Sequence, residues 1–281
     1  MTANSIGSKL EWLARCGYSA RGVIYLIIGG LALMTAVGAG GQTTGSKGVL
    51  WVILAQPFGQ TLLAVIAVGL VGFAAWRFAQ AVWDADGHGR DAKGLIIRAG
   101  LLVSAVTQVS LAFLAVSLIF GWSTGGSGKN TQGWTAWLLS LPLGRWLVGI
   151  LGLIVIGVGV AHFVKGWQAE FEKHFKMDHQ KYKWISPVCR FGLISRGAVF
   201  LIIGGFFIVA ALEFNSGEAR GFQGALDALR QQPYGPWLLG VVALGLIAFG
   251  FYSIIASFYR RINESAVEGL PGQCEVPNVY L

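Results

Sequence analysis

Residues 15–30 read RCGYSARGVIYLIIGG, and residues 190–205 read RFGLISRGAVFLIIGG. Both copies place two arginines and a glycine directly before a long apolar run. A weaker third copy, RAGLLVSAVTQVSLAF, covers residues 98–113. Self-similarity of this kind is the signature of an internally duplicated architecture. We therefore expect a chain built from three related units.

The composition indicates a membrane protein. Hydrophobic residues make up 54% of the chain, charged residues only 12%, and the mean hydropathy is +0.62. Soluble domains carry about a quarter charged residues, whereas a helix needs roughly 20 mostly apolar residues to cross a bilayer. Six such segments lie near 20–38, 61–83, 95–120, 144–165, 190–212 and 236–258. The sequence predicts an all-α, polytopic membrane protein with six transmembrane helices.

The spans group into three hairpins within a single membrane domain, 1–281. The repeat units cover 8–86, 91–175 and 186–262, and an irregular C-terminal tail covers 264–281. Caps at Ser8, Asp91 and Ser186 predict where the first helix of each unit begins. In each unit a polar, glycine-rich loop leads into a short interfacial helix, and a Pro-x-Gly sequence follows that helix. The short helices are expected at 49–56, 134–141 and 222–232, and the prolines are Pro57, Pro142 and Pro233.

Small residues recur at every seventh position after the first arginine of each unit, on one face of the predicted helix. The stripe could line a ligand groove or form a helix–helix packing seam, since small residues let helices approach closely in lipid. We favour packing. Its members are Gly22, Gly29 and Ala36 in the first unit, Ala105 and Ala112 in the second, and Gly197, Gly204 and Ala211 in the third.

The basic residues predict an orientation. Of the 21 lysines and arginines, 16 fall on the side of the chain termini and 5 on the opposite side. Cytoplasmic loops carry the excess of positive charge, so both termini should be cytoplasmic in a bacterial plasma (inner) membrane. This topology explains most of the net charge of +8. The expected partners are membrane lipids, anionic on the cytoplasmic face, with a protein partner or a second copy of the chain as further options; nucleic acid is not expected.

The paired-arginine openings and the Pro-x-Gly sequences resemble a bacterial integral membrane family catalogued as a domain of unknown function. That family has three repeated helix hairpins with R-x-G-x-x-x-R-G-x-x-[YF] openings. The resemblance covers roughly 10–262 and is strongest in the first and third units. In the middle unit Ser104, Ala105 and Gln108 stand where the first unit has arginine, glycine and tyrosine. The resemblance implies the fold and topology but no activity.

The arginines of the openings are the candidate lipid- or partner-binding residues. Only 16 uncharged residues separate Arg196 from Glu213, which is about 24 Å of helix against a hydrocarbon core of roughly 30 Å. Arg196 should therefore lie at or just inside the headgroup boundary, where it snorkels or pairs with an acid, a carbonyl or a ligand. Asp84 and Asp86 are candidate acids. The candidate binding residues are Arg15, Arg21, Arg98, Arg190 and Arg196.

Other chemistry has weaker support. Glu170, His174 and Asp178 would share one helix face and could bind a divalent metal, although a solvated charged face is the commoner explanation. His162 has no second histidine on another span to complete a haem site. The three cysteines form no spaced cluster, and no catalytic or nucleotide-binding motif is present. We therefore expect neither an enzyme nor a cofactor.

Two functions remain open. The first is a non-enzymatic accessory or structural membrane protein that binds lipid or a protein partner. The alternative is a small-solute or ion transporter or channel, with a polar path between the repeats lined by Ser104, Thr107 and Gln108. A continuous polar cavity would favour transport, and a dry core would favour the accessory role.

Overall fold

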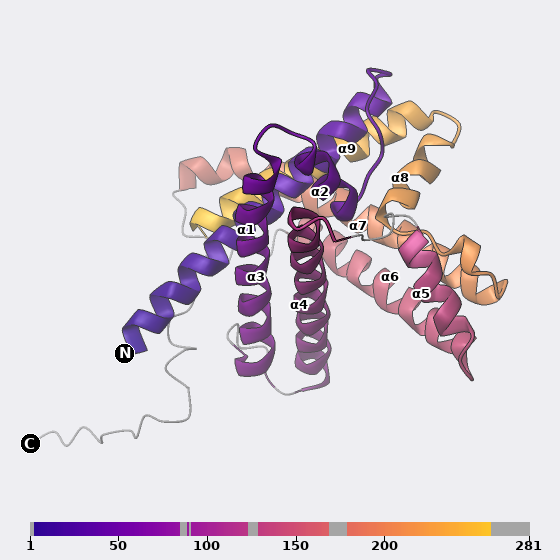
Figure 1. Cartoon of the computed structure of the whole chain (residues 1–281), viewed down its shortest axis with the longest axis horizontal. Helices are drawn as coiled ribbons and strands as arrows, with labels where there is room; N and C mark the ends of the chain where they lie inside the picture. Colours follow the sequence, from indigo (N-terminus) through magenta and orange to yellow (C-terminus); the bar gives the residue numbers. More distant parts are fainter. Residues whose placement is uncertain (1–2, 85–88, 90, 123–128, 169–178, 260–281) are drawn as a thin grey trace, which may run out of the picture.

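The computed structural model describes residues 3–84, 89, 91–122, 129–168 and 179–259 (Figure 1). These residues are mostly helical and contain no β-strand. The six long helices are α1 (Ala3–Ala36), α3 (Gly59–Trp83), α4 (Ala92–Ile119), α6 (Gly144–Gln168), α7 (His179–Leu212) and α9 (Gly235–Tyr259). The short ones are α2 (Ser46–Leu54), α5 (Lys129–Leu139), the 3-10 helix η2 (Ser216–Glu218) and α8 (Phe222–Arg230).

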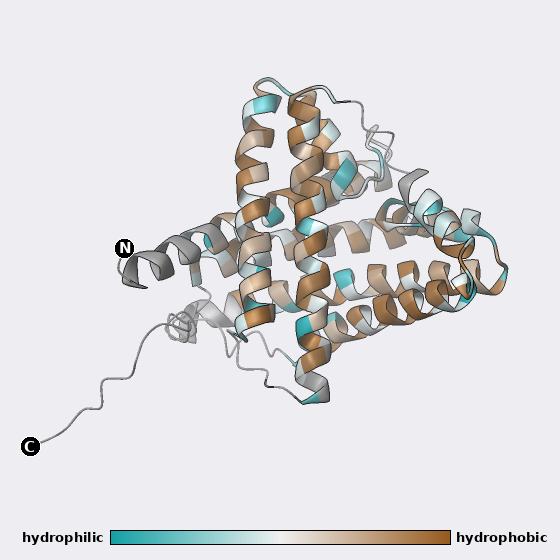
Figure 2. Cartoon of the chain, turned by 60° about the horizontal axis from the view of Figure 1, so that its bottom comes forward, coloured by the Kyte–Doolittle hydropathy of each residue, from teal (hydrophilic) through white to brown (hydrophobic). Residues whose placement is uncertain are grey.

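The six predicted spans and the three short helices are confirmed. Each long helix is long and apolar enough to cross a membrane. These helices consist mostly of hydrophobic residues (Figure 2), and many of their large hydrophobic side chains are exposed. Helices suit this environment because hydrocarbon offers no hydrogen-bond partner to the backbone, so each segment must satisfy its own. The chain is a multi-pass membrane protein.

Two of the three predicted helix starts are wrong. Helix α1 begins at Ala3, before Ser8, and α7 begins at His179, so that Pro187 lies inside the helix. A proline in a helix removes one backbone hydrogen bond, and here the helix continues through it. The start at Asp91 is confirmed, because its carboxylate accepts a 3.1 Å hydrogen bond from the backbone N–H of Gly94.

The Pro-x-Gly sequences form the same turn three times. The middle residue adopts a left-handed backbone conformation, with φ of 62° at Phe58, 67° at Leu143 and 61° at Tyr234. The following glycine begins the second long helix of the unit and lies against carbonyl oxygens at the end of the short helix. A Cβ atom at that glycine would overlap these oxygens, so the turn requires the residue that the sequence repeats.

The closest helix pairs form between units. Helix α1 packs along α9, α3 along α4, and α6 along α7, and these pairs run in three different directions in Figure 1. Each second long helix therefore packs against the first long helix of the next unit, and the third unit returns to the first. The predicted hairpins describe the chain order, but the packing units cross their boundaries.

The small-residue stripe is the seam of these pairs. A Cβ atom at Gly29 would lie 2.8 Å from the carbonyl oxygen of Ala243 on α9, and one at Gly204 would lie 2.9 Å from that of Gly152 on α6. Such contacts are possible only where the backbones nearly touch. The packing interpretation of the stripe is confirmed.

The six long helices form an open arc. Helices α1, α3, α7 and α9 make up its centre, because α1 also packs on α3 and α7 on α9. Helix α4 extends the arc beyond α3, and α6 extends it beyond α7. Helices α4 and α6 do not pack along each other, although they belong to the same unit. The order around the arc is α4, α3, α1, α9, α7, α6.

Candidate functional site

The first arginine of each unit completes the end of a neighbouring helix. Arg15 donates hydrogen bonds of 2.9 and 2.8 Å to the last carbonyl oxygens of α9. Arg98 donates bonds of 2.6 and 3.0 Å to those of α3, and Arg190 donates bonds of 3.2 and 2.6 Å to those of α6. The final carbonyls of a helix lack partners within the helix and carry its negative dipole end, so a guanidinium stabilises them. We call this end of the protein the capped end.

A different set of arginines meets in the centre of the arc. The guanidinium carbon of Arg21 lies 5.5 Å from the ring centre of Phe73 and 4.9 Å from that of Phe249. Arg77 lies 4.8 Å from the Phe73 ring, and Arg196 lies 4.5 Å from the Phe249 ring. Because they share rings, the three guanidiniums come from α1, α3 and α7 into one place, which we call the arginine cluster.

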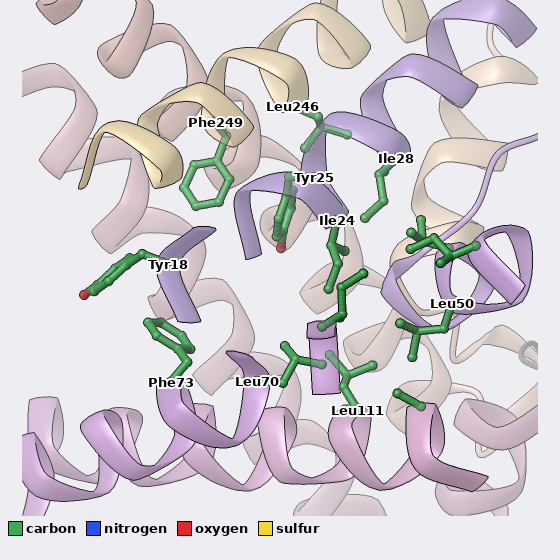
Figure 3. Close-up of a cluster of buried hydrophobic side chains, with 14 of the residues drawn as sticks. Tyr18, Ile24, Tyr25, Ile28, Leu50, Leu70, Phe73, Leu111, Leu246 and Phe249 are labelled. Carbon is green, nitrogen blue, oxygen red and sulfur yellow. The ribbon is translucent and has the colours of Figure 1, made fainter. Parts of the chain in front are cut away.

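Aromatic rings surround the arginine cluster. Arg196 also lies 5.0 Å from the ring centre of Tyr25 and 5.1 Å from that of Phe200. The rings of Tyr25 and Phe249 meet edge to face at 4.8 Å, and Figure 3 shows them close together, with Tyr18 beside Phe73. Aromatic faces attract a guanidinium, by about 0.5–2 kcal/mol for each contact. They hold the cations in place but do not neutralise them.

The arginine cluster lacks an acid. In the part of the chain that the structure describes, no carboxylate pairs with Arg21, Arg77 or Arg196. The Nε atom of Arg77 and the Nε and Nη1 atoms of Arg196 are buried and make no hydrogen bond. Another N–H of Arg77 donates a 3.2 Å bond to the fully buried Gln80. Unpaired buried donors on a cation cost several kcal/mol, so the arginine cluster is the electrostatically costliest arrangement among the described side chains.

The depth of the cluster follows from helix geometry. Arg21 lies seven residues inside the candidate span Ala14–Ala36, and Arg77 lies six residues before the end of Gly59–Trp83. At 1.5 Å per residue, both are about 10 Å from the capped end. The cluster therefore lies inside the protein, nearer the capped end than the opposite end of these helices.

The arginine cluster occupies repeat positions. Arg21, Ser104 and Arg196 stand at the same place in the first long helix of their units, six residues after the first arginine. Arg77 and His162 stand at the same place in the second long helix, twenty residues after the proline. His162 stacks on Phe200 with ring centres 5.8 Å apart, and the Phe200 ring also lies against Arg196.

The predicted polar path is only partly assembled. Ser104 and Gln108 are half-buried on α4, and within the described residues neither makes a hydrogen bond. Thr107 is exposed, and its hydroxyl donates a 2.8 Å bond to the carbonyl oxygen of Val103 on its own helix. The structure therefore keeps two of the three residues as candidates for contact with a ligand.

The remaining candidates lie elsewhere. Asp84 accepts a 2.8 Å hydrogen bond from the backbone N–H of Gly89 and does not pair with Arg21 or Arg196 as expected. Asp86, the other candidate acid, and residues 170, 174 and 178, which are the alternative metal ligands, lie outside the described part of the chain. Among the residues that are described, no group of histidine, cysteine, aspartate and glutamate could hold a metal ion. Cys16 and Cys189 are free thiols.

Comparison with known proteins agrees with the repeat. The family described as Domain of Unknown Function (DUF1206) matches the chain three times, at residues 16–84, 99–169 and 191–260. The chain belongs to this family. Each DUF1206 match begins one residue after the first arginine of a unit. One DUF1206 unit therefore contains a long helix, a short helix and a second long helix.

A curated relative spans nearly the whole chain. The chain is 38% identical over 256 residues to "Uncharacterized protein YxxB" of Bacillus subtilis (strain 168), covering 90% of this chain and 92% of that protein. No solved structure matches the chain. The DUF1206 relationship therefore establishes the family and leaves the function to be inferred from the arginine cluster.

Sequence reasoning missed Arg77. It selected Arg21 and Arg196 because they open the repeats, whereas Arg77 lies near the end of an apolar helix and was counted only as a topology signal. Two signals could have identified it: it interrupts a long uncharged run, and it aligns with His162 when positions are counted from the proline. Polar residues at matching repeat positions would have indicated a shared site.

Proposed function

We propose that this protein is a non-enzymatic accessory membrane protein that binds an anionic, phosphate-bearing ligand in the arginine cluster. The observation that carries the proposal is the convergence of Arg21, Arg77 and Arg196 without an acid among the described residues. Charged groups within a membrane protein are costly and usually serve a function. Guanidinium groups present planar pairs of donors that match phosphate oxygens.

The proposal includes a location and an orientation. We propose that the capped end, where α1 begins and α9 ends, faces the cytoplasm across a bacterial plasma membrane, and the excess of lysine and arginine at that end supports this orientation. Anionic lipids are enriched on that face and attract basic protein surfaces. The expected ligand chemistry is therefore available at the end of the protein nearest the cluster, either as a lipid headgroup or as a free phosphate.

Transport of a small anion is the second candidate. One observation favours it: Ser104 and Gln108 are half-buried on a membrane helix and make no hydrogen bond within the described residues. Polar side chains left free in this way could contact an ion that moves past the cluster. Uptake of phosphate into sealed vesicles that contain the protein would separate transport from binding.

The binding proposal is tested with the purified full-length protein. The triple variant Arg21→Gln, Arg77→Gln, Arg196→Gln removes the charge and keeps polar side chains. Binding of inorganic phosphate and of short-chain phosphatidic acid is measured by calorimetry and by the shift in melting temperature. We expect both ligands to stabilise the wild type and neither to stabilise the triple variant.

Arg220 provides the matched control. It also lies over a ring, 5.4 Å from the centre of Phe206, but it has an acid, Glu218, at 3.7 Å. Arg220→Gln should leave ligand binding unchanged. Wild-type protein that binds neither ligand, or a triple variant that binds them as tightly as the wild type, would overturn the proposal.

A further inference from the structure

We infer that the ligand of the arginine cluster is a membrane lipid with a phosphate-bearing headgroup, which reaches the cluster sideways from the bilayer between α4 and α6. This inference rests on the proposed binding function and adds the source of the ligand and its route. We call the region between α4 and α6 the open side.

The arc leaves this side without a packed helix pair. Residues of the arginine cluster and its rings come from α3, α1, α9 and α7, and consecutive members of that series pack against each other. Helix α6 adds His162 at the edge of the cluster. The two ends of the arc, α4 and α6, do not pack along each other. Of the sides formed by described helices, the open side is the one that packing does not close.

The glycine at the third position of each opening shows that the middle unit is packed differently from the other two. Gly17 and Gly192 occupy the third position of their openings and lie directly against Phe73 and Phe249, so the two long helices of those units touch. Gly100 holds that position in the middle unit, and a Cβ atom there would find nothing within 4 Å. Val158 replaces the phenylalanine on α6. The middle unit thus keeps the glycine but lacks the contact.

Both helices of the open side present apolar surface. The span of α6 is the least buried of the six, because only 17% of its most apolar stretch is buried inside the protein; the span of α4 follows with 33%. In a bilayer such surface is covered by acyl chains. Its exposed residues include Val103, Val106 and Phe113 on α4 and Leu147, Ile150 and Leu153 on α6.

Each of these two helices also carries a polar residue at a repeat position of the arginine cluster. Ser104 on α4 holds the repeat position that Arg21 and Arg196 hold in the cluster. His162 on α6 stacks on Phe200, which also lies against Arg196. An apolar, acyl-covered surface beside a cationic cluster matches the two parts of a phospholipid.

The depth of the cluster is within reach of a lipid phosphate. A 25-residue helix such as α3 or α9 is about 37 Å long, against a hydrocarbon core of roughly 30 Å. A residue about 10 Å from the helix end therefore lies only a few ångströms inside the headgroup boundary. A lipid phosphate can descend this far where arginines replace its hydration.

The test uses a side chain that fills the open side. Gly100→Trp adds bulk where a Cβ atom has free space, so the fold should tolerate it. Val109→Trp adds the same bulk at an exposed position of α4, nine residues from Gly100 and so on the opposite face of the helix, and is the control. Ser104→Trp is a second blocking variant, one turn deeper. Retention of dioleoyl phosphatidic acid relative to dioleoyl phosphatidylcholine is measured by native mass spectrometry, and binding of inorganic phosphate is measured by calorimetry.

We expect the wild type and Val109→Trp to retain phosphatidic acid at least tenfold over phosphatidylcholine. Gly100→Trp and Ser104→Trp should lower that retention at least tenfold while inorganic phosphate still binds, which also shows that the variants are folded. Unchanged lipid retention in both blocking variants, or wild-type protein that binds phosphate but no phosphatidic acid, overturns lateral access and leaves the binding proposal standing. Wild-type protein that binds neither ligand overturns the binding proposal itself.

Discussion

The two adjacent glycines in each strong opening should respond in opposite ways to the same substitution. A Cβ atom at Gly29 would lie 2.6 Å from Cγ1 of Ile247 and 2.8 Å from the carbonyl oxygen of Ala243. A Cβ atom at Gly30 would find nothing within 4 Å. Both glycines lie inside α1, so Gly29→Ala and Gly30→Ala differ in what the new methyl group meets.

The magnitude follows from two opposing terms. Replacing glycine by alanine inside a helix favours the folded state by up to about 1 kcal/mol, and both variants gain it. At Gly29 the methyl group meets the backbone of α9, which cannot turn away as a side chain can, and overpacking of this kind costs about 1–3 kcal/mol. Gly30→Ala should therefore raise the free energy of unfolding by about 0.5–1 kcal/mol relative to the wild type. The free energy of unfolding of Gly29→Ala should be about 1–3 kcal/mol lower than that of Gly30→Ala.

The assay is reversible unfolding of the purified protein in mixed micelles, titrated with SDS and followed by tryptophan fluorescence. The third unit offers an internal repeat, because Gly204 meets α6 as Gly29 meets α9, while Gly205 has free space. Equal stabilities of the two alanine variants in both units would refute the close α1–α9 and α6–α7 pairing. If Gly29→Ala were the more stable of the two variants, Gly30 rather than Gly29 would face α9.

Three further changes test other parts of the structure. Arg98→Met should lower the free energy of unfolding by about 2 kcal/mol, because two charged hydrogen bonds to the end of α3 are lost. Arg145 is exposed, and Arg145→Met should change the free energy of unfolding by less than about 0.5 kcal/mol. Equal effects of the two substitutions would contradict the capping role of Arg98. Tyr234→Gly should raise the free energy of unfolding by about 1 kcal/mol, because Tyr234 has a left-handed backbone with φ of 61°, which glycine adopts more readily. A lower free energy of unfolding for this variant would refute the strain at Tyr234. Ser104→Arg should bind inorganic phosphate more tightly in calorimetry, and unchanged affinity would place Ser104 away from the cluster.

The sequence was sufficient for the elements of the fold. Charge-free runs predict helices where hydrocarbon is the solvent, because the backbone has no other way to satisfy its hydrogen bonds. The Pro-x-Gly repeats located the three turns, and the stripe of small residues identified the packing face. Ser8 and Pro187 misled the prediction of helix starts, since cap-type residues also occur within helices whose flanking residues favour the helix.

The pairing of helices could not be read from the repeat. A stripe shows that a helix face is packed, but Gly22 and Gly197 look alike in sequence and meet different partners, α9 and α6. The same limit applies to Arg15. The sequence predicts lipid or partner contact for Arg15 because this arginine opens a repeat. Its actual acceptors, the last carbonyl oxygens of α9, lie more than 240 residues away in the chain. Backbone carbonyls carry no sequence signal, so the cap was visible only in the structure.

The departures of the middle unit have a common effect. Ser104 stands where a fourth guanidinium would have joined three that have no acid partner among the described residues, and so it limits the repulsion within the cluster. Gln108 and Val158 replace aromatic residues that hold the long helices of the other units around the cluster, where Tyr25 and Phe249 meet. The same three positions therefore lower the charge of the cluster and leave one side of it without packed helices. A fully symmetric chain would bring a fourth guanidinium to the cluster and pack both long helices of every unit together, and the middle unit does neither.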